Sequence, residues 1–254
     1  MWGVIPAAGR GSRIQPLAFS KELLPVGSRT DGVRERPCAV SEYLVERMIA
    51  GGADKLCFVI APGKSDIMEY YGEGYGGAAA AFVVQPEASG LCDAVFRARH
   101  LLGPDESVLV GLPDTVWFPL DGFAHLPDER LSFLLFPVET PEVFDAVVLD
   151  AEARVVAIDV KSPNARSNWI WGAFKMPGHL FHELDAFWRA RGQQDEYFGT
   201  LVNAWIAEGG EAYGVTSGET YVDVGTFPGY RIAVGMLGQG APAQHTPSHK
   251  AISE

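Results

Sequence analysis

The sequence predicts an α/β protein whose core is a Rossmann-like, doubly wound, mostly parallel mixed sheet flanked by helices. Short and nearly continuous apolar runs, such as residues 55–61 and 107–112, are typical of strands that are buried on both faces of a sheet. Segments with apolar residues at helical spacing follow these runs, as in residues 41–50. This alternation of strands and helices favours parallel strands joined by right-handed crossovers.

In the first half of the chain, an apolar strand around Val4-Ile5-Pro6 leads into a loop of small residues. Gly51-Gly52 ends the first helix, and Pro113 ends the last strand of this half. We expect helices over residues 41–50, 65–71 and about 91–102, and further strands over residues 55–61, 80–85 and 107–112.

The second half has a more mixed pattern, with Pro, Asp and Glu between short apolar runs. Residues 238–254 are polar and rich in Pro, Gly and Ser, and we expect a flexible tail there after a single domain over residues 1–237. We expect strands over residues 131–136, 146–149, 155–160, 169–176, 212–215 and 220–224, and helices over residues 178–191 and 196–208.

The composition is that of an ordinary globular protein, but its charge is unevenly distributed. The chain has 254 residues, of which 47% are hydrophobic, and a formal net charge of −12. So acidic a protein is poorly suited to bind nucleic acid, which requires Lys and Arg against the phosphates. Residues 9–36 nevertheless contain six Lys or Arg against three Asp or Glu. This local surplus favours a small anionic ligand over a polymer.

The cysteines and the length of the apolar runs bear on the compartment. Cys38, Cys57 and Cys92 form no CxxC pair, and three thiols cannot all be joined in disulfides. Reduced thiols are typical of the cytoplasm. No apolar run approaches membrane-spanning length, and the first four residues lack the basic region of a signal peptide. We therefore expect a cytoplasmic protein with no membrane partner.

The loop after the first strand has the features of a phosphate-binding site. Gly9 and Gly11 lack a Cβ, so the backbone can adopt positive φ and present N–H groups to an anion. Arg13 and Lys21 add two cations. Arg13 stands where a P-loop requires Lys, and Ile14 replaces the third glycine of the dinucleotide-binding fingerprint. The loop is therefore predicted to bind phosphate, but by neither of these two motifs.

Two carboxylates stand out because apolar residues flank them. Asp114 follows the predicted strand 107–112 through Pro113, and Asp223 lies within Tyr-Val-Asp-Val-Gly-Thr. A buried carboxylate requires a cation or hydrogen-bond donors nearby. Two carboxylates together with substrate phosphates are a common way to hold Mg²⁺. The two residues are more than a hundred positions apart, so the sequence leaves open whether they converge.

The glycine loop and five later segments, in the same order, resemble the sugar-1-phosphate nucleotidyltransferases, which make nucleotide sugars. The resemblance covers roughly residues 2–230 and is closest to the UDP-glucose and dTDP-glucose branches. The loop itself is followed by Lys21-Glu22-Leu23-Leu24-Pro25. The five segments are Val84-Gln85-Pro86 with Gly90, Leu112-Pro113-Asp114, Asp159-Val160-Lys161-Ser162-Pro163, Trp171-Gly172-Ala173-Phe174 and Tyr221-Val222-Asp223-Val224-Gly225-Thr226.

This resemblance implies the fold of the nucleotide-diphospho-sugar transferases and their reaction. A nucleoside monophosphate would pass from a nucleoside triphosphate, dTTP or UTP, to a sugar 1-phosphate or a similar small phosphate, with Mg²⁺ as cofactor. One phosphate oxygen of the acceptor attacks the α-phosphorus in line, and pyrophosphate leaves. Two anions meet in this step, so catalysis consists mainly of charge neutralisation and alignment. No general base is required, because the attacking phosphate is already ionised.

The resemblance also implies roles for the matching residues. The nucleotide would be bound by the half over about residues 1–115 and the acceptor by the half over 116–237. The catalytic cations would be Arg13, Lys21 and Lys161, and the metal ligands Asp114 and Asp223. The nucleotide would contact Ala8, Gly9, Gly11, Ser12, Arg13, Gln85, Pro86 and Gly90. The acceptor would contact Asp159, Lys161 and Gly172.

Gln85 is the residue that indicates which nucleotide base would be bound. Its side-chain amide has both a donor and an acceptor, which suits the edge of uracil or thymine. A surface glutamine before a turn-forming proline is the structural alternative.

Several departures from the family pattern bear on the acceptor. The spacing from Arg13 to Lys21 is shorter than in the glucose-1-phosphate enzymes, residues 28–36 resemble an insertion, and Pro113 replaces a glycine. Val160 stands where the family often has a glutamate that hydrogen-bonds sugar hydroxyls. Loss of that acceptor would impair recognition of a glucose-like ring. We therefore expect a modified sugar, a cyclitol or another small phosphate or phosphonate rather than glucose 1-phosphate.

Two alternatives stay open. One is a cytidylyltransferase that acts on a non-glucose acceptor, such as a cyclitol phosphate or a phosphonate. The other is a catalytically inactive, nucleotide-binding regulatory relative. The retained Arg13, Lys21, Asp114, Lys161 and Asp223 argue against the second, because a degenerate copy tends to lose its charged site residues first. Members of this family often assemble into dimers or tetramers, so a homo-oligomer is a further expectation.

Overall fold

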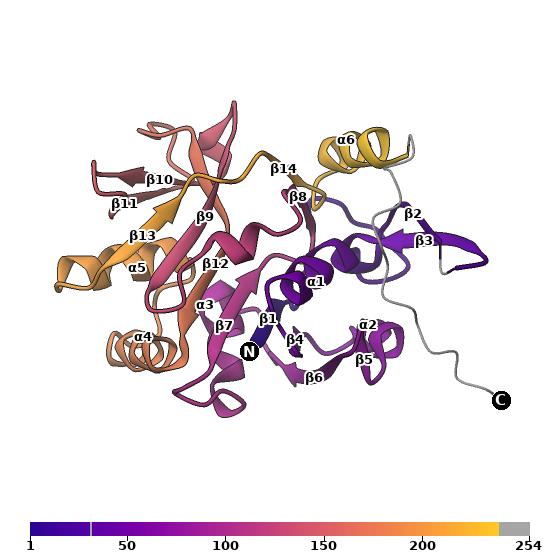
Figure 1. Ribbon diagram of the computed structural model, residues 1–254, viewed down its shortest axis with the longest axis horizontal. Helices are drawn as coiled ribbons and strands as arrows, with labels where there is room; N and C mark the ends of the chain where they lie inside the picture. Colours follow the sequence, from indigo (N-terminus) through magenta and orange to yellow (C-terminus); the bar gives the residue numbers. More distant parts are fainter. Residues whose placement is uncertain (31, 239–254) are drawn as a thin grey trace.

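The computed structural model describes residues 1–30 and 32–238 of the chain (Figure 1). The tail predicted over residues 238–254 lies outside this description except for its first residue. The first half contains β1 (Trp2–Pro6), β2 (Pro25–Thr30), β3 (Glu35–Ala39), α1 (Val40–Ala50), β4 (Lys55–Ile60), α2 (Ser65–Tyr71), β5 (Gly74–Tyr75), β6 (Ala78–Val84), α3 (Gly90–Phe96), β7 (Ser107–Gly111) and β8 (Thr115–Phe118). The second half contains β9 (Leu131–Pro137), β10 (Asp145–Leu149), β11 (Val155–Val160), β12 (Trp169–Pro177), α4 (Gly178–Ala190), α5 (Phe198–Ala207), β13 (Ala212–Val215), β14 (Thr220–Asp223) and α6 (Phe227–Leu237).

Within the described residues, ten strands form one central sheet. Its main path runs β11-β10-β12-β7-β1-β4-β6-β5, and β9 pairs with both β12 and β13. The core of the first half, β7-β1-β4-β6, is parallel. The strands β10, β11 and β12 of the second half pair antiparallel with their neighbours. The predicted α/β architecture with a mixed sheet is confirmed, and the parallel part comes from the segments where strands and helices alternate.

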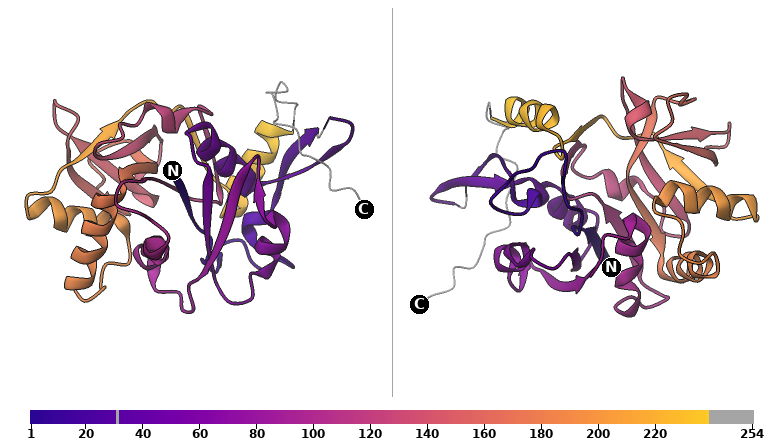
Figure 2. Two further views of the ribbon diagram at one scale, coloured as in Figure 1. Left: turned by 60° about the horizontal axis from the view of Figure 1, so that its bottom comes forward. Right: turned by 180° about the vertical axis from the view of Figure 1, so that it is seen from behind.

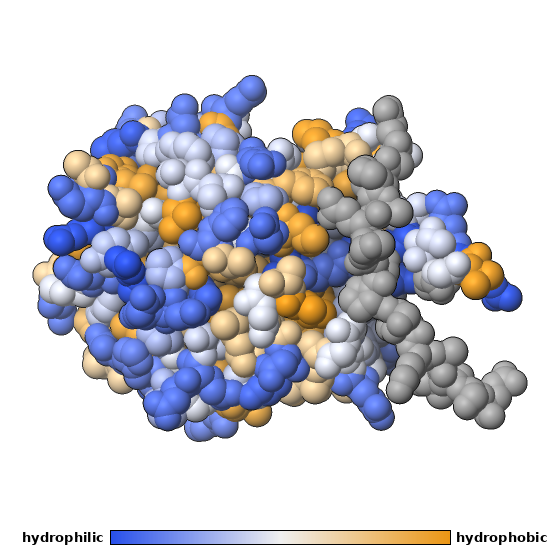
Figure 3. All heavy atoms as spheres, viewed as in Figure 1, coloured by the Kyte–Doolittle hydropathy of each residue, from blue (hydrophilic) through white to orange (hydrophobic). Residues whose placement is uncertain are grey.

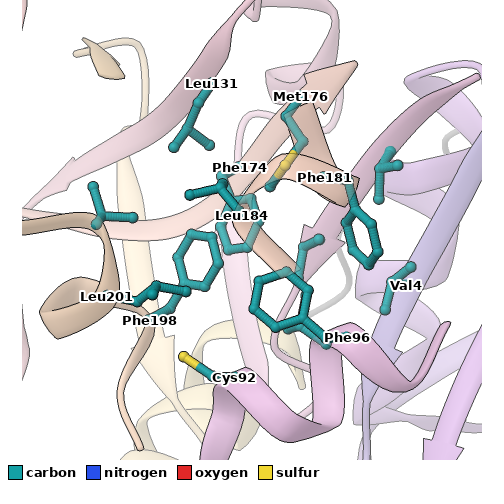
Figure 4. Packing of buried hydrophobic residues seen from close by; sticks show 14 of the residues in the cluster. Val4, Cys92, Phe96, Leu131, Phe174, Met176, Phe181, Leu184, Phe198 and Leu201 are labelled. Atoms are coloured by element: carbon teal, nitrogen blue, oxygen red, sulfur yellow. The ribbon is translucent and has the colours of Figure 1, made fainter. Parts of the chain in front are cut away.

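Helices cover both faces of this sheet (Figures 1 and 2). Neighbouring residues of β1 point to opposite faces, so that Val4 joins the core under α3, α4 and α5 while Ile5 joins the core under α1 and α2. Figure 4 shows the first of these cores, in which the rings of Phe174 and Phe198 stack with their centroids 4.3 Å apart. Strands buried on both faces explain why the apolar runs of the sequence are continuous.

Several elements were not predicted from the sequence. The predicted helix over residues 91–102 is α3 followed by a tighter 3₁₀ turn, Arg97–His100. Within the segment at 28–36 that resembles an insertion, residues 28–30 belong to β2 and residues 35–36 to β3, which pair as an antiparallel hairpin. The predicted strand near residues 220–224 leaves the central sheet and, as β14, pairs with β8 in a separate two-stranded sheet. Helix α6 was not predicted either.

The hairpin, α6 and the β8–β14 pair share a small core of their own. Val26 of β2, Val222 of β14 and Leu237 of α6 are buried together in it. The outer surface of α6 stays apolar, with Phe227 and Ile232 more than half exposed, and apolar side chains are visible over this helix in Figure 3. The hairpin and α6 therefore form one end of the molecule, next to the β8–β14 pair (Figure 1).

Glu42, on the first turn of α1, joins this end to the rest of the fold. Its side chain is fully buried and accepts hydrogen bonds from both Nη atoms of Arg36, each at 2.8 Å, and from the Tyr75 hydroxyl at 2.7 Å. Tyr70 donates to the same carboxylate, and the N–H of Ala39 donates at 2.9 Å, which caps the helix. Burial alone would raise the pKa of Glu42, but these donors outweigh it and lower the pKa to about 2.

We expect Glu42→Gln to reduce the free energy of unfolding at neutral pH by roughly 3 kcal/mol, because it leaves the Arg36 guanidinium without its buried partner. The folded-state pKa of Glu42 lies below its unfolded-state value of 4.5, so the stabilisation is complete above pH 4.5 and is lost as the pH falls towards 2. Urea unfolding at pH 7 and near pH 3 should therefore show a smaller difference between wild type and variant at the lower pH. The exposed Glu69→Gln serves as control, and a pH-independent difference would contradict this account.

The described residues include no helix with the length and apolarity that crossing a bilayer requires. Cys38, Cys57 and Cys92 are all buried and free. This agrees with the expectation that the three thiols are not all joined in disulfides.

Candidate active site

The loop after β1 lies at the carboxyl end of the parallel strands, where α/β sheets commonly bind ligands. Ala7 and Ala8 are buried, and the N–H of Ala7 donates to the Val59 carbonyl at 2.8 Å, which extends the sheet pairing into the loop. Gly9 is exposed, and Gly11 has a φ of 64°, which favours glycine. The prediction that both glycines adopt positive φ is therefore confirmed for Gly11 and not for Gly9.

Lys21 lies beneath this loop. A Cβ on Gly11 would come within 2.7 Å of the Lys21 Cδ, so the glycine also makes room for the lysine chain. The next residue, Glu22, is buried and accepts hydrogen bonds from the Lys64 Nζ at 2.8 and 2.9 Å. The same Nζ donates to the Ala7 carbonyl at 2.7 Å. This buried pair fixes the base of the glycine loop to the segment that carries Lys21.

Two carboxylates meet opposite this lysine. Asp114 follows β7, and the antiparallel pairing of β8 with β14 places Asp223 opposite Thr115. The N–H of Val224 donates to the Asp114 carbonyl at 2.8 Å. A Cβ on Gly225 would lie 2.6 Å from the Asp114 Oδ2 and 2.9 Å from the Asp223 Oδ1, so both side chains converge over this glycine. Asp114 and Asp223, which the sequence could not place relative to each other, therefore lie side by side.

Each carboxylate has its own cation. The Lys21 Nζ forms an ion pair with the Asp114 Oδ2, and both side chains are largely buried. The Arg13 Nη1 donates to the Asp223 Oδ2 at 2.8 Å, with the arginine side chain 61% exposed. Arg13 therefore extends from the same group of charges towards solvent, where a phosphate can reach it.

The electrostatics of this group follow from its geometry. Burial would lower the pKa of Lys21, but the carboxylates of Asp114 and Glu22 raise it above its usual value. Burial would raise the pKa of Asp114, but Lys21 lowers it. Burial and the neighbouring Asp114 raise the pKa of Asp223, against the opposing effect of Arg13. We call Arg13, Lys21, Asp114 and Asp223 the charge cluster.

The second predicted nucleotide segment lies at the end of β6. Gln85 is buried, and its Nε2 donates to the Asp93 Oδ2 at 2.8 Å and to the Gly90 carbonyl at 3.1 Å. Both amide hydrogens are therefore engaged within the protein, which leaves the amide oxygen for a ligand. Pro86 is exposed, and Gly90 has a φ of 91°. Contact of Gln85, Pro86 and Gly90 with a nucleotide stays a prediction.

The predicted acceptor residues come from β11, the turn after it, and β12. Lys161 has a φ of 44° at the end of β11, and its Nζ lies 4.2 Å from the centroid of the Tyr197 ring. Asp159 forms a two-pronged ion pair with Arg166, in which the shorter contact joins Nη2 and Oδ1 at 2.6 Å. Gly172 lies against the ring of Tyr221, two residues before Asp223. Lys161 is exposed and free to meet a phosphate, whereas Asp159 is engaged by Arg166.

Asp145, on β10, is a candidate site residue that the sequence analysis missed. It is the first residue of an otherwise apolar strand, Asp-Ala-Val-Val-Leu, and lies opposite Val160 in the ladder of β10 and β11. The Trp171 Nε1 donates to its Oδ2 at 3.3 Å. The signal that could have found it is the one that identified Asp223, a lone carboxylate in an apolar stretch.

Tyr221 lies between the charge cluster and this part of the molecule. Its ring contacts those of Phe136 and Phe144, with centroids 5.3 and 5.7 Å apart. Burial, together with the carboxylates of Asp223, Asp114 and Asp145, raises the pKa of its hydroxyl well above the usual value. The three carboxylates therefore act on the hydroxyl of one partly buried tyrosine.

Comparisons of this chain with protein families, with curated proteins and with solved structures all lead to nucleotidyltransferases. The model of a family described as nucleotidyl transferase matches residues 2–236. A glucose-1-phosphate thymidylyltransferase of Mycolicibacterium smegmatis is 25% identical over an alignment of 243 residues, and the match covers 89% of this chain and 78% of that protein.

Two solved structures share the fold. One, from Bacillus anthracis in complex with a sucrose, has a TM-score of 0.78 at 21% identity and covers 96% of this chain and 98% of its own. The other, a UTP-bound UGPase from Acinetobacter baumannii, has a TM-score of 0.75 at 19% identity and covers 95% of this chain and 94% of its own.

Proposed function

Because this chain belongs to the nucleotidyl transferase family, we propose that it transfers a nucleoside monophosphate from dTTP or UTP to a sugar 1-phosphate or a similar small phosphate. The observation that carries this proposal is the charge cluster, in which two carboxylates and two cations converge beside a glycine loop. Names of relatives that use thymidylyl and uridylyl donors support the choice of nucleotide. The cytidylyltransferase alternative has no comparable support, and the retained charges argue against an inactive regulatory relative.

In the proposed reaction, an oxygen of the acceptor phosphate forms a bond to the α-phosphorus of the nucleotide. The bond from that phosphorus to the bridging oxygen of the β-phosphate breaks, and its electron pair leaves with pyrophosphate. Arg13 and Lys21 would neutralise the nucleotide phosphates, and Lys161 would position the acceptor phosphate. All three side chains act by charge, so no group on the protein has to exchange a proton.

Asp114 and Asp223 have the ligand chemistry that Mg²⁺ requires. Their oxygens converge over Gly225, and carboxylates with substrate phosphates form a common magnesium site. When bound, Mg²⁺ would draw negative charge from the phosphate oxygens. Without it, Asp114 is held by Lys21 and Asp223 by Arg13, which keeps both carboxylates in place.

The two halves of the chain would divide the work. The half over about residues 1–115 supplies the glycine loop, Lys21 and Gln85 for the nucleotide. The half over residues 116–237 supplies Lys161 and Gly172 for the acceptor, and its Asp223 completes the metal site. Three free, buried cysteines support a reducing compartment, the cytoplasm. A homo-oligomer is proposed by analogy with the family alone.

Pyrophosphate release tests this proposal. With Mg²⁺ present, dTTP, UTP, CTP, ATP and GTP would each be combined with phosphorylated sugars, cyclitols and phosphonates. We expect turnover with dTTP or UTP and a phosphorylated ring, and its loss when EDTA removes the metal. Turnover with CTP alone would favour the cytidylyltransferase, and nucleotide binding without turnover would favour the inactive relative.

A further inference from the structure

Asp145 is a partly buried carboxylate with few partners among the described residues. Among the described residues, the indole N–H of Trp171 is the hydrogen-bond donor that reaches it, at 3.3 Å. A carboxylate has about four acceptor positions, and in a half-buried place those not used by the protein are open to water or a ligand. Burial raises the pKa of Asp145, against the opposing effects of Trp171 and the Lys161 ammonium. This carboxylate therefore has capacity for a further donor.

Strand pairing fixes where this side chain lies. The N–H of Lys161 donates to the Phe144 carbonyl at 2.9 Å, so the next pair, Asp145 with Val160, is of the closer, non-hydrogen-bonded kind. Both side chains stand on the face covered by α5. A Cβ on Gly199 would lie 2.8 Å from the Val160 Cγ2 and 3.3 Å from the Asp145 Oδ2. Val160 offers no polar atom here, so Asp145 is the carboxylate of this pair.

The neighbouring carboxylate Asp159 lies one position along β11, on the opposite face, because side chains alternate along a strand. It pairs across the ladder with Ala146 and is occupied by Arg166. Among the described residues, no arginine forms an ion pair with Asp145. Of these two carboxylates, Asp145 is therefore the one available to a ligand.

The other charged groups near Asp145 relate it to the proposed reaction. The Lys161 ammonium, proposed to position the acceptor phosphate, acts on Asp145 from the turn after β11. The ring of Phe144, the residue before Asp145, lies with its centroid 5.7 Å from that of Tyr221, which is two residues before Asp223 of the charge cluster. Because Lys161 follows Val160, the ladder partner of Asp145, and Phe144 contacts Tyr221, the carboxylate lies between the lysine and the strand that carries Asp223.

We propose that Asp145 selects the acceptor by accepting a hydrogen bond from a ring hydroxyl of a phosphorylated polyol, a sugar or a cyclitol, whose phosphate Lys161 holds. This inference rests on the proposed function. It disfavours acyclic phosphates and phosphonates, which lack a ring hydroxyl at that position. It also supplies a carboxylate beside Val160, where the sequence alone indicated that a hydroxyl acceptor had been lost.

The test uses the full chain and measures kcat/KM by pyrophosphate release. Wild type, Asp145→Asn and the control Glu142→Gln would be compared; Glu142 is exposed and lies three residues earlier. The acceptors are α-D-glucose 1-phosphate, myo-inositol 1-phosphate, the single-deoxy analogues of each, and glycerol 1-phosphate as an acyclic phosphate. Nucleotide affinity and thermal unfolding of all three proteins are measured in parallel.

We expect Asp145→Asn to lower kcat/KM for a ring acceptor roughly 10- to 100-fold, the effect of losing a hydrogen bond to a charged group, with nucleotide affinity unchanged. One deoxy analogue should lower wild-type kcat/KM by a similar factor and cause little further loss in Asp145→Asn. Glu142→Gln should behave as wild type. Glycerol 1-phosphate should be a poor acceptor for all three proteins.

Different results overturn different claims. If wild type transfers to no acceptor, the proposed function fails and this inference fails with it. If wild type is active but Asp145→Asn has the same kcat/KM as Glu142→Gln, only the claim that Asp145 selects the acceptor is wrong. The same claim is wrong if every deoxy analogue lowers the kcat/KM of Asp145→Asn by an equal factor. If Asp145→Asn does not fold, the deoxy analogues are tested with the wild-type protein alone. The inference is contradicted if none of the single-deoxy analogues lowers wild-type kcat/KM by about tenfold.

Discussion

Asp223→Asn is expected to lower the rate of nucleotidyl transfer about a thousandfold, with the fold intact. The variant removes one of two carboxylates proposed to hold Mg²⁺, and charge stabilisation by a bound metal contributes several kcal/mol to such a reaction. Asp223 is partly desolvated and lies close to Asp114, so its neutralisation should relieve repulsion. The midpoint of thermal unfolding should therefore stay the same or rise.

Glu219→Gln is the matched control for this prediction, because Glu219 is exposed and lies four residues before Asp223. Pyrophosphate release at saturating Mg²⁺ gives the rates, and thermal unfolding without metal gives the stabilities. Asp223 would not be a metal ligand if Asp223→Asn kept more than a tenth of wild-type activity. A large fall in stability would mean that the residue holds the fold instead.

Lys21→Met is expected to lower both activity and stability. Its ammonium is the buried partner of Asp114, and removing one member of a buried ion pair typically costs about 3–5 kcal/mol because the other charge is left unpaired. Loss of a cation at the phosphates should lower kcat/KM roughly 100- to 1,000-fold. Urea unfolding and pyrophosphate release measure the two effects separately.

A double variant separates the two roles of Lys21. Lys21→Met with Asp114→Asn removes both charges, so most of the lost stability should return while kcat/KM stays at or below that of Lys21→Met. Lys55→Met is the control, because Lys55 pairs with Glu106 at the surface, where ion pairs contribute about 1 kcal/mol or less. Unchanged stability and activity in Lys21→Met would show that Lys21 is an ordinary surface charge.

Much of the fold was predictable because its signals are local. Strands buried on both faces gave continuous apolar runs, and the glycine pattern after β1 gave the loop with Gly11 at positive φ. Asp114 was identified for the same kind of reason, since a carboxylate directly after a buried strand is unusual. The short 3₁₀ turn after α3 was missed because helical spacing does not separate a 3₁₀ turn from an α-helix.

The rest depends on contacts between distant residues, which one sequence does not specify. The pairing of β14 with β8 decides that Asp223 meets Asp114, and neither strand carries a signal for its partner. The β2–β3 hairpin is stabilised by Glu42 and α6 rather than by its own sequence, so residues 28–36 looked like an insertion. Asp145 was missed because the sequence does not show that Asp145 lies opposite Val160 in the ladder of β10 and β11.

Transfer of the α-phosphate is the central claim, and a labelled nucleotide tests it most directly. UTP or dTTP carrying ³²P at the α position would be incubated with Mg²⁺ and a phosphorylated ring acceptor. The account predicts that the label moves into a nucleoside diphosphate joined to the acceptor, with one pyrophosphate released per product and neither formed by Asp114→Asn. Label that stays in the triphosphate, or that appears only in free nucleoside monophosphate, would contradict it.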